Sequence, residues 1–379
     1  CSRRSANIPA ATTSPSTASA LALFERCVSL QPENPDYLKA VAAAYVRGGQ
    51  TTEGIEVYRK LIDVDANRAG GYYRELLDVY LKADFQKEAI ETAQKVVELS
   101  PSDAESYLSL GQVYMMYRQT DDALAAYRSA LRLEPDEPDY YRQYGQALQQ
   151  ESRLGEAEEA YRKMLDAAKE DDTRLQAVGQ LAGIHQRLGR MDGLLEEFQS
   201  RVRNTPKRLA AYQELGAIHA QAGDTARSLA VLESAYNVVD DKGAVLKALV
   251  RASFEAQDFE RVVRYFEELI GMSGKASAFE YERLGQVYAQ LGEIDKARST
   301  WQRIVDEDKD NPKAYVTLAK ALRDSGFEEE AAAATQAALE RDPHNYSLRY
   351  EYAQTLAGQE DMGTAYEQLQ LLLELGPSE

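Results

Sequence analysis

The chain has 379 residues, 62 of them acidic and 44 basic, and its formal net charge of −18 opposes binding to nucleic acid, whose phosphates repel an acidic protein. No apolar run approaches the roughly 18 residues that a transmembrane helix needs. The two cysteines, Cys1 and Cys27, are too few for a disulfide framework or a zinc-binding pattern.

The first residues differ in composition from the rest of the chain. Residues 1–17 are rich in Ala, Ser, Thr and Pro and offer little apolar surface to bury, so they predict a flexible tether. A helical pattern begins near Ala18. In ASALALFERCVSLQP (18–32), Ala20, Phe24 and Pro32 occupy the places that later second helices give to such residues, which predicts half a repeat before the first complete one.

From residue 35 onward one pattern recurs ten times with a period of about 34 residues, as from Pro101 to Pro135 and from Gly111 to Gly145. Each repeat holds two apolar-periodic stretches of about 14 residues, long enough for helices but too short to bury a core alone. The eighth residue is small in eight of the ten repeats: Ala42, Gly111, Gly145, Ala182, Gly216, Gly285, Ala319 and Ala353. A small residue at this place lets two antiparallel helices approach closely.

Turn signals lie where the helices of a repeat must stop. Five glycines fall between the first and the second helix: Gly49, Gly189, Gly223, Gly292 and Gly326. About three extra residues, around 169–175, interrupt the spacing before the fifth repeat.

This pattern resembles the tetratricopeptide repeat family over nearly the whole chain, about residues 18–379. The resemblance implies an all-α, right-handed superhelical solenoid of about ten and a half repeats, with a concave groove lined by the first helix of each repeat. It also implies a protein-binding scaffold rather than an enzyme, without a cofactor.

By this resemblance, the second, fifth, sixth, ninth, twelfth and thirteenth residues of each repeat face the groove. Glutamine recurs there, and an amide that both donates and accepts hydrogen bonds suits an extended peptide backbone. Two methionines add an adaptable apolar patch. The alternative is that glutamine is simply a good solvated helix former. The candidate binding residues are Gln112, Met115, Met116, Arg142, Gln146, Gln149, Gln180, Arg187, Gln213 and Gln286, and the groove positions also hold Gln143, Gln150, Gln176, Gln186, Gln221 and Gln290.

Histidine offers the only other candidate chemistry. His185 and His219 are 34 residues apart and occupy the same place in adjacent repeats, so a metal-binding or pH-sensing pair is one interpretation. The other is packing, because Tyr114 and Tyr288 fill that place elsewhere. The sequence predicts no catalytic residue and no metal site.

The beginning of the sequence resembles a mature bacterial lipoprotein, in which an N-terminal cysteine carries acyl chains and a flexible tether follows. This resemblance implies lipidation of Cys1, which anchors the protein at the membrane, and partners among the cell-envelope proteins. Ser2 resembles the outer-membrane sorting signal, which implies the inner leaflet of the outer membrane, facing the periplasm. The alternatives are a cytoplasmic adaptor or regulator without a lipid, and a numbering that starts at an arbitrary point of a longer gene product.

The end of the sequence, TAYEQLQLLLELGPSE (364–379), reads as the second helix of the tenth repeat. We expect Leu369, Leu372 and Leu373 to pack inward, and Leu371 and Leu375 to extend the apolar surface around the helix. Such a patch indicates an interface, either for self-association or for a partner. The alternative is an ordinary frayed end.

Overall fold

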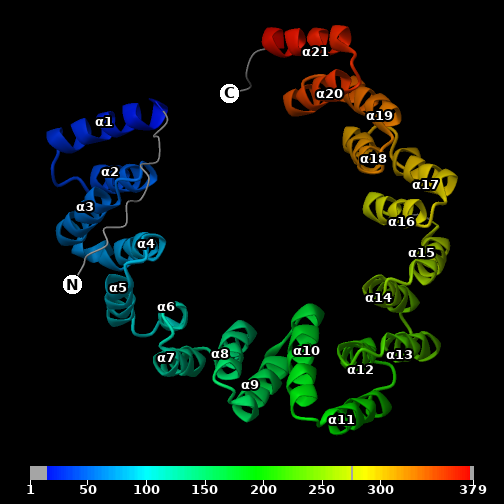
Figure 1. Ribbon diagram of the computed structural model, residues 1–379, viewed down its shortest axis with the longest axis horizontal. Helices are drawn as coiled ribbons and strands as arrows, with labels where there is room; N and C mark the ends of the chain where they lie inside the picture. Colours follow the sequence, from blue (N-terminus) through cyan, green and yellow to red (C-terminus); the bar gives the residue numbers. More distant parts are fainter. Residues whose placement is uncertain (1–14, 275, 376–379) are drawn as a thin grey trace, which may run out of the picture. The chain divides into compact units, whose positions relative to one another are not determined.

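The computed structural model describes residues 15–274 and 276–375, and these residues form helices joined by short turns, with no β-strand among them (Figure 1). The helices of the first half are α1 (Pro15–Leu30), α2 (Pro35–Arg47), α3 (Thr51–Val64), η1 (a 3-10 turn, Ala66–Arg68), α4 (Ala69–Lys82), α5 (Gln86–Leu99), α6 (Ala104–Met116), α7 (Thr120–Leu133), α8 (Pro138–Gln150), α9 (Leu154–Ala167) and α10 (Asp171–Arg187). Those of the second half are α11 (Met191–Asn204), α12 (Leu209–Gln221), α13 (Thr225–Val238), α14 (Lys242–Glu255), α15 (Phe259–Ser273), α16 (Ala278–Gln290), α17 (Ile294–Asp306), α18 (Pro312–Asp324), α19 (Glu328–Arg341), α20 (Tyr346–Gly358) and α21 (Met362–Leu375).

The order of the helices confirms the all-α repeat fold. After α1, the described helices follow one another as ten pairs, from α2 and α3 to α20 and α21, so α1 is the expected half repeat. The chain divides within α10 into two compact parts, which we call the N-terminal segment (residues up to 184) and the C-terminal segment (residues from 185). The extra residues before the fifth repeat are absorbed by α10, which has 17 residues where most first helices have 13.

The turn between the helices of a pair requires one residue in the left-handed region. The five glycines expected there have φ angles between +64° and +82°. In the other five pairs a non-glycine residue takes the same conformation with φ between +55° and +65°: Asp84, Arg118, Ser152, Gln257 and Glu360. Left-handed backbone costs an L-residue roughly 1–2 kcal/mol, so these five turns are held by the packing of the helices on either side.

Close helix contacts explain the small residues. A Cβ atom added to Gly111 would lie 2.4 Å from the ring of Tyr127, and one added to Gly145 would lie 2.7 Å from the ring of Tyr161. In each case the aromatic residue comes from the second helix of the same pair, 16 residues later. Ala123, at the small position of a second helix, is completely buried. The expectation that small residues allow close approach of the two helices is confirmed.

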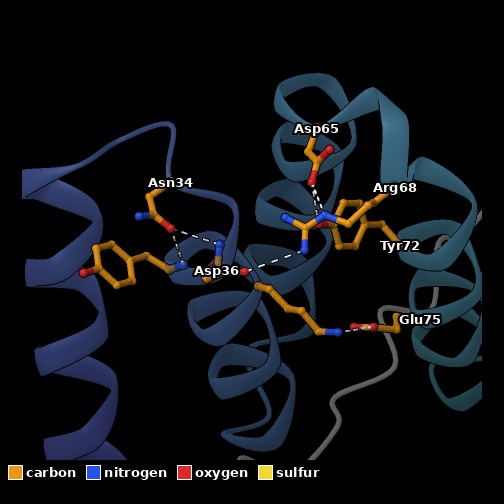
Figure 2. Close-up of polar contacts among 8 residues, drawn as sticks. Asn34, Asp36, Asp65, Arg68, Tyr72 and Glu75 are labelled. Atoms are coloured by element: carbon orange, nitrogen blue, oxygen red, sulfur yellow. Dashed lines mark hydrogen bonds and ion pairs between the residues drawn. The ribbon is translucent and has the colours of Figure 1, made fainter.

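Polar contacts fix the boundary between the first and second repeats (Figure 2). The Oδ1 atom of Asn34 caps α2 by accepting a hydrogen bond from the backbone N–H of Asp36 at 3.1 Å. The Nε atom of Arg68 donates to Asp65 at 2.5 Å, and the hydroxyl of Tyr72 donates to the same carboxylate at 2.9 Å. Both donors stabilise the charged form, so the hydrogen bonds from Tyr72 and Arg68 lower the pKa of Asp65.

Candidate protein-binding surface

Polar side chains join the first helices of successive repeats in the N-terminal segment. The ammonium group of Lys39 on α2 lies 2.6 Å from the carboxylate of Glu75 on α4. Further along, the side-chain amide of Gln112 on α6 donates to the amide oxygen of Gln143 on α8 at 2.8 Å. Polar contacts between first helices therefore cross two separate repeat boundaries, from α2 to α4 and from α6 to α8.

The glutamines of α6 and α8 form the densest part of this surface. Gln112 and Gln146 are exposed, and Gln143 donates to the carboxylate of Asp139 at 2.7 Å. Arg142 binds the same carboxylate through its Nε atom at 2.7 Å. Asp139 thus orients two candidate residues at once. The i,i+3 and i,i+4 spacing of Asp139 to Arg142 and Gln143 is the signal that could have identified it from the sequence.

The remaining candidates of α6 and α8 are partly engaged within the protein. Gln149 is half-buried and accepts a hydrogen bond from the hydroxyl of Tyr161 at 3.1 Å. Met115 is half-buried, whereas Met116 is 59% exposed. We call Gln112, Gln143, Gln146 and Met116 the inner surface.

The other four candidates lie on first helices further along the chain. Gln180 on α10 is half-buried, and Arg187 at the end of α10 is exposed. Gln213 on α12 is half-buried, and its buried Oε1 atom has no hydrogen-bond partner in the described part of the chain. Gln286 on α16 is half-buried and donates to Glu282, one turn earlier, at 3.5 Å. These glutamines do not bond to one another in the described structure, so the ladder of amides is local to α6 and α8.

The two histidines are both buried, in places that pack between helices. The Nδ1 atom of His185 lies 3.1 Å from the backbone oxygen of Arg190. Burial lowers the pKa of His219, which favours its neutral form. Within residues 15–274 and 276–375 no three His, Cys, Asp or Glu side chains are grouped in a way that could hold a metal ion. In the same residues, no helix combines the length and apolar composition needed to cross a membrane.

Comparison with known families finds the tetratricopeptide repeat in three stretches, residues 104–147, 281–311 and 316–379. These stretches cover the α6–α7 pair, nearly all of the α16–α17 pair and the α20–α21 pair. In these three stretches the chain carries tetratricopeptide repeats. Among curated proteins, none matches the sequence significantly.

Several solved structures are similar to parts of this chain. MamA from Desulfovibrio magneticus is 23% identical, with 40% of this chain and 86% of that chain covered and a TM-score of 0.34. A tetratricopeptide repeat protein from Parabacteroides merdae is 14% identical, with 67% and 98% covered and a TM-score of 0.37. The tetratricopeptide repeat domain of P58(IPK) is 14% identical, with 81% and 93% covered and a TM-score of 0.29.

The last tetratricopeptide repeat exposes an apolar stripe on α21. Of the three leucines expected to pack inward, only Leu372 is half-buried; Leu369 is 40% exposed and Leu373 is 84% exposed. Leu371 is exposed, as expected, and the side chain of Leu375 lies outside the described residues. Together with Met362 and Tyr366, two of these leucines make a stripe at helical spacing, which we call the terminal stripe: Met362, Tyr366, Leu369 and Leu373.

The terminal stripe occupies the face that earlier second helices bury. The residues that lie 34 positions before Tyr366, Leu369 and Leu373 are all buried in α19: Ala332, Thr335 and Leu339. Helix α19 contacts the first helix of the next repeat, α20. The inward expectation for Leu373 was wrong, because its equivalent in α19, Leu339, is buried where a following first helix, α20, contacts α19. Leu369 lies 16 positions after Ala353, the spacing at which Tyr127 and Tyr161 meet their own first helices, yet 40% of it is exposed.

Proposed function

We propose that this tetratricopeptide-repeat protein is a non-catalytic scaffold that binds an extended segment of a partner protein on its inner surface. The observation that carries the proposal is the bond between Gln112 and Gln143, which joins two repeats, beside the exposed amide of Gln146. Amides at successive places can pair with both the N–H and the C=O groups of a peptide backbone. Exposed Met116 adds an apolar contact that adapts to different side chains.

Site-specific crosslinking in cells tests this surface directly. We expect the photo-reactive residue p-benzoylphenylalanine in place of Met116 to crosslink to a partner. The same residue in place of Gln86, which is exposed on the second helix α5, should not crosslink to that partner. The double variant Gln112→Glu/Gln146→Glu should lose the adduct. Its matched control, Gln86→Glu/Gln199→Glu, adds the same charge at exposed places on second helices and should keep it. Equal capture from positions 116 and 86 would contradict the proposal.

We also propose, from the sequence alone, that the scaffold is anchored at the cell envelope by a lipid on Cys1 and serves the assembly of an envelope complex. Cys1 lies outside the described residues. The support is a cysteine followed by a polar stretch rich in Ser and Thr; each buried methylene of an acyl chain contributes about 0.8 kcal/mol to membrane binding. The alternative is a cytoplasmic adaptor with the same inner surface.

Metabolic labelling separates these two locations. In cells that express the full gene and are fed an alkyne fatty acid, the protein should carry the label and sediment with membranes, and Cys1→Ser should lose both properties while its helical content stays unchanged. The control Cys27→Ser should keep the label. An unlabelled native protein in the soluble fraction would favour the cytoplasmic adaptor and would leave the crosslinking result from the inner surface standing.

For the terminal stripe we propose a second copy of this chain as the occupant. The stripe continues the kind of interface by which α19 packs on α20 within the chain, and its residues recur every three or four positions over the whole of α21. Two copies of the stripe can pack against each other about a two-fold axis. The two α21 helices then run antiparallel, so the beginning of one contacts the end of the other. The self-association test is given in the Discussion.

A further inference from the structure

A cleft of about 660 Å³ opens between α7, α8 and α9, apart from the inner surface. Helix α7 contributes two arginines, Arg128 and Arg132, and helix α8 contributes Tyr141 and Tyr144, which are both half-buried. Helix α9 contributes Lys163. The volume falls in the range of sites that hold a small ligand or a few side chains of a partner.

The arginines of this cleft bond to uncharged groups, although the charge of Arg128 also helps to lower the pKa of Glu156 across the cleft. The Nε atom of Arg128 donates to the backbone oxygen of Leu124 at 3.2 Å, and the Nη2 atom of Arg132 donates to the hydroxyl of Ser129 at 2.9 Å. In the part of the chain that the structure describes, neither guanidinium forms an ion pair with a carboxylate. Both side chains are exposed and lie one helical turn apart.

The acidic groups of the cleft are already engaged by other bases. Arg153 binds Glu156 with two hydrogen bonds, of 2.7 and 2.6 Å, and Lys163 lies 3.4 Å from Glu159. The hydrogen bond from Arg153 is also the main reason why the pKa of Glu156 is lowered, so this carboxylate is charged and paired at neutral pH. In a chain of net charge −18, the cleft therefore keeps uncompensated positive charge.

The same cleft occurs two repeats earlier with the opposite balance of charge. Between α3, α4 and α5, a cleft of about 440 Å³ has Asp63 at the place of Arg132 and Leu76 at the place of Tyr144. Its one arginine, Arg59, donates to the hydroxyl of Tyr80. Two basic and three acidic residues line this earlier cleft, against three basic and two acidic in the later one. The fold alone thus does not make the later cleft basic.

We propose that the cleft of α7, α8 and α9 binds an acidic segment of a partner protein. Carboxylates of the segment pair with Arg128 and Arg132, because a guanidinium presents two parallel N–H groups that match a carboxylate. An apolar or aromatic side chain of the segment packs against the rings of Tyr141 and Tyr144. Net negative charge over the rest of the chain disfavours nucleic acid as the occupant. The site is separate from the inner surface and does not depend on it.

Binding to the whole chain tests the site with a defined probe. A short fluorescein-labelled peptide, rich in Glu and containing one Trp, should raise its fluorescence anisotropy with the wild-type protein, and its affinity should fall as salt is added. The same peptide with Gln in place of Glu should bind at least about tenfold more weakly, since charge-assisted hydrogen bonds are roughly twice as strong as neutral ones.

Matched variants use the earlier cleft as the control. Arg132→Asp introduces the residue found at the equivalent place of the earlier cleft and should weaken binding of the Glu-rich peptide at least about tenfold. Arg132→Lys should weaken binding less, because lysine keeps the positive charge but cannot form the bidentate pair of a guanidinium. The reciprocal Asp63→Arg/Leu76→Tyr should create a second binding site. Circular dichroism verifies that each variant keeps its helices. Unchanged affinity of Arg132→Asp, or equal binding of the Gln peptide, would overturn the proposal. The proposal would also be overturned if inorganic phosphate or a single-stranded oligonucleotide displaced the labelled peptide at concentrations as low as those at which the unlabelled peptide displaces it.

Discussion

The indole of Trp301 lies directly over Gly285, so a Cβ atom added to the glycine would be 2.1 Å from the Nε1 atom of the ring. Trp301 is completely buried, and its Nε1–H donates to the backbone oxygen of Glu282 at 3.1 Å. The ring therefore cannot move aside without breaking a buried hydrogen bond. This relationship fixes the distance between α16 and α17.

Gly285→Ala should therefore destabilise the protein, by about 1–3 kcal/mol, because it overpacks a contact that has no room. Gly216 is the matched control, since it holds the same place in its repeat but a Cβ atom added there would lie 3.4 Å from the Oγ atom of Ser228, an ordinary van der Waals contact. Gly216→Ala should leave stability unchanged or raise it by up to about 1 kcal/mol, because alanine favours the helix and its Cβ atom meets only ordinary contacts. The urea midpoint measures both. Equal midpoints for the two variants would show that Trp301 relaxes out of the way.

Ser152→Gly should stabilise the turn between α8 and α9 by about 0.5–1 kcal/mol. Ser152 has φ of +59°, in the left-handed region, where glycine pays no steric cost. Gly326→Ser is the reverse change in the equivalent turn, where φ is +82°, and should destabilise by a similar amount. Thermal unfolding of both variants checks the sign. A lower melting temperature for Ser152→Gly would mean that the serine contributes a contact that outweighs the backbone strain.

Alkaline pH should destabilise the protein partly through Tyr127. Burial raises the pKa of this tyrosine from 10.0 to about 12. Its hydroxyl then keeps its proton in the folded state when the unfolded chain has already lost it, so stability falls as the pH rises from about 10 to about 12. The loss is at most about 1.4 kcal/mol per pH unit for one group.

Tyr127→Phe removes this titration and should flatten the decline. The comparison is the change in urea midpoint between about pH 9 and about pH 11 for the variant and for the wild type. Tyr141→Phe, at a half-buried tyrosine, is the control for the loss of a hydroxyl. Identical slopes for Tyr127→Phe and the wild type would indicate that Tyr127 ionises normally, through water entering between α6 and α7.

Leu369→Gln/Leu373→Gln should weaken self-association at the C-terminal edge at least about tenfold, because both leucines belong to the terminal stripe, both are exposed, and glutamine removes their apolar contact. Leu99→Gln/Leu133→Gln makes the same change at exposed leucines on α5 and α7 and should leave association unaltered. Sedimentation velocity over a range of concentrations gives the oligomeric state. If the wild-type chain stays monomeric throughout, the terminal stripe is not an interface between copies.

The sequence by itself determined the helical repeat, its period and the contacts inside each helix pair. Those contacts join residues at a constant separation, such as Gly285 and Trp301, 16 positions apart, so they leave a regular trace in the chain. The same regularity placed Gln112, Gln143 and Gln146 on one kind of surface, and the hydrogen bond between the first two agrees with that placement.

Only the tertiary structure decided what depends on neighbouring repeats. The left-handed conformation of Ser152 is imposed by the helices on either side, against the preference of serine. Leu373 has the apolar character of a core residue, yet it is exposed because burial there requires another helix beyond α21. Arg132 and Asp63 hold equivalent places in their repeats, and the sequence shows only that one is basic and the other acidic. That Arg132 lines a basic cleft follows only from the packing of α7, α8 and α9. Periodicity records contacts within a repeat, whereas the charge of a cleft is summed over three helices from two repeats.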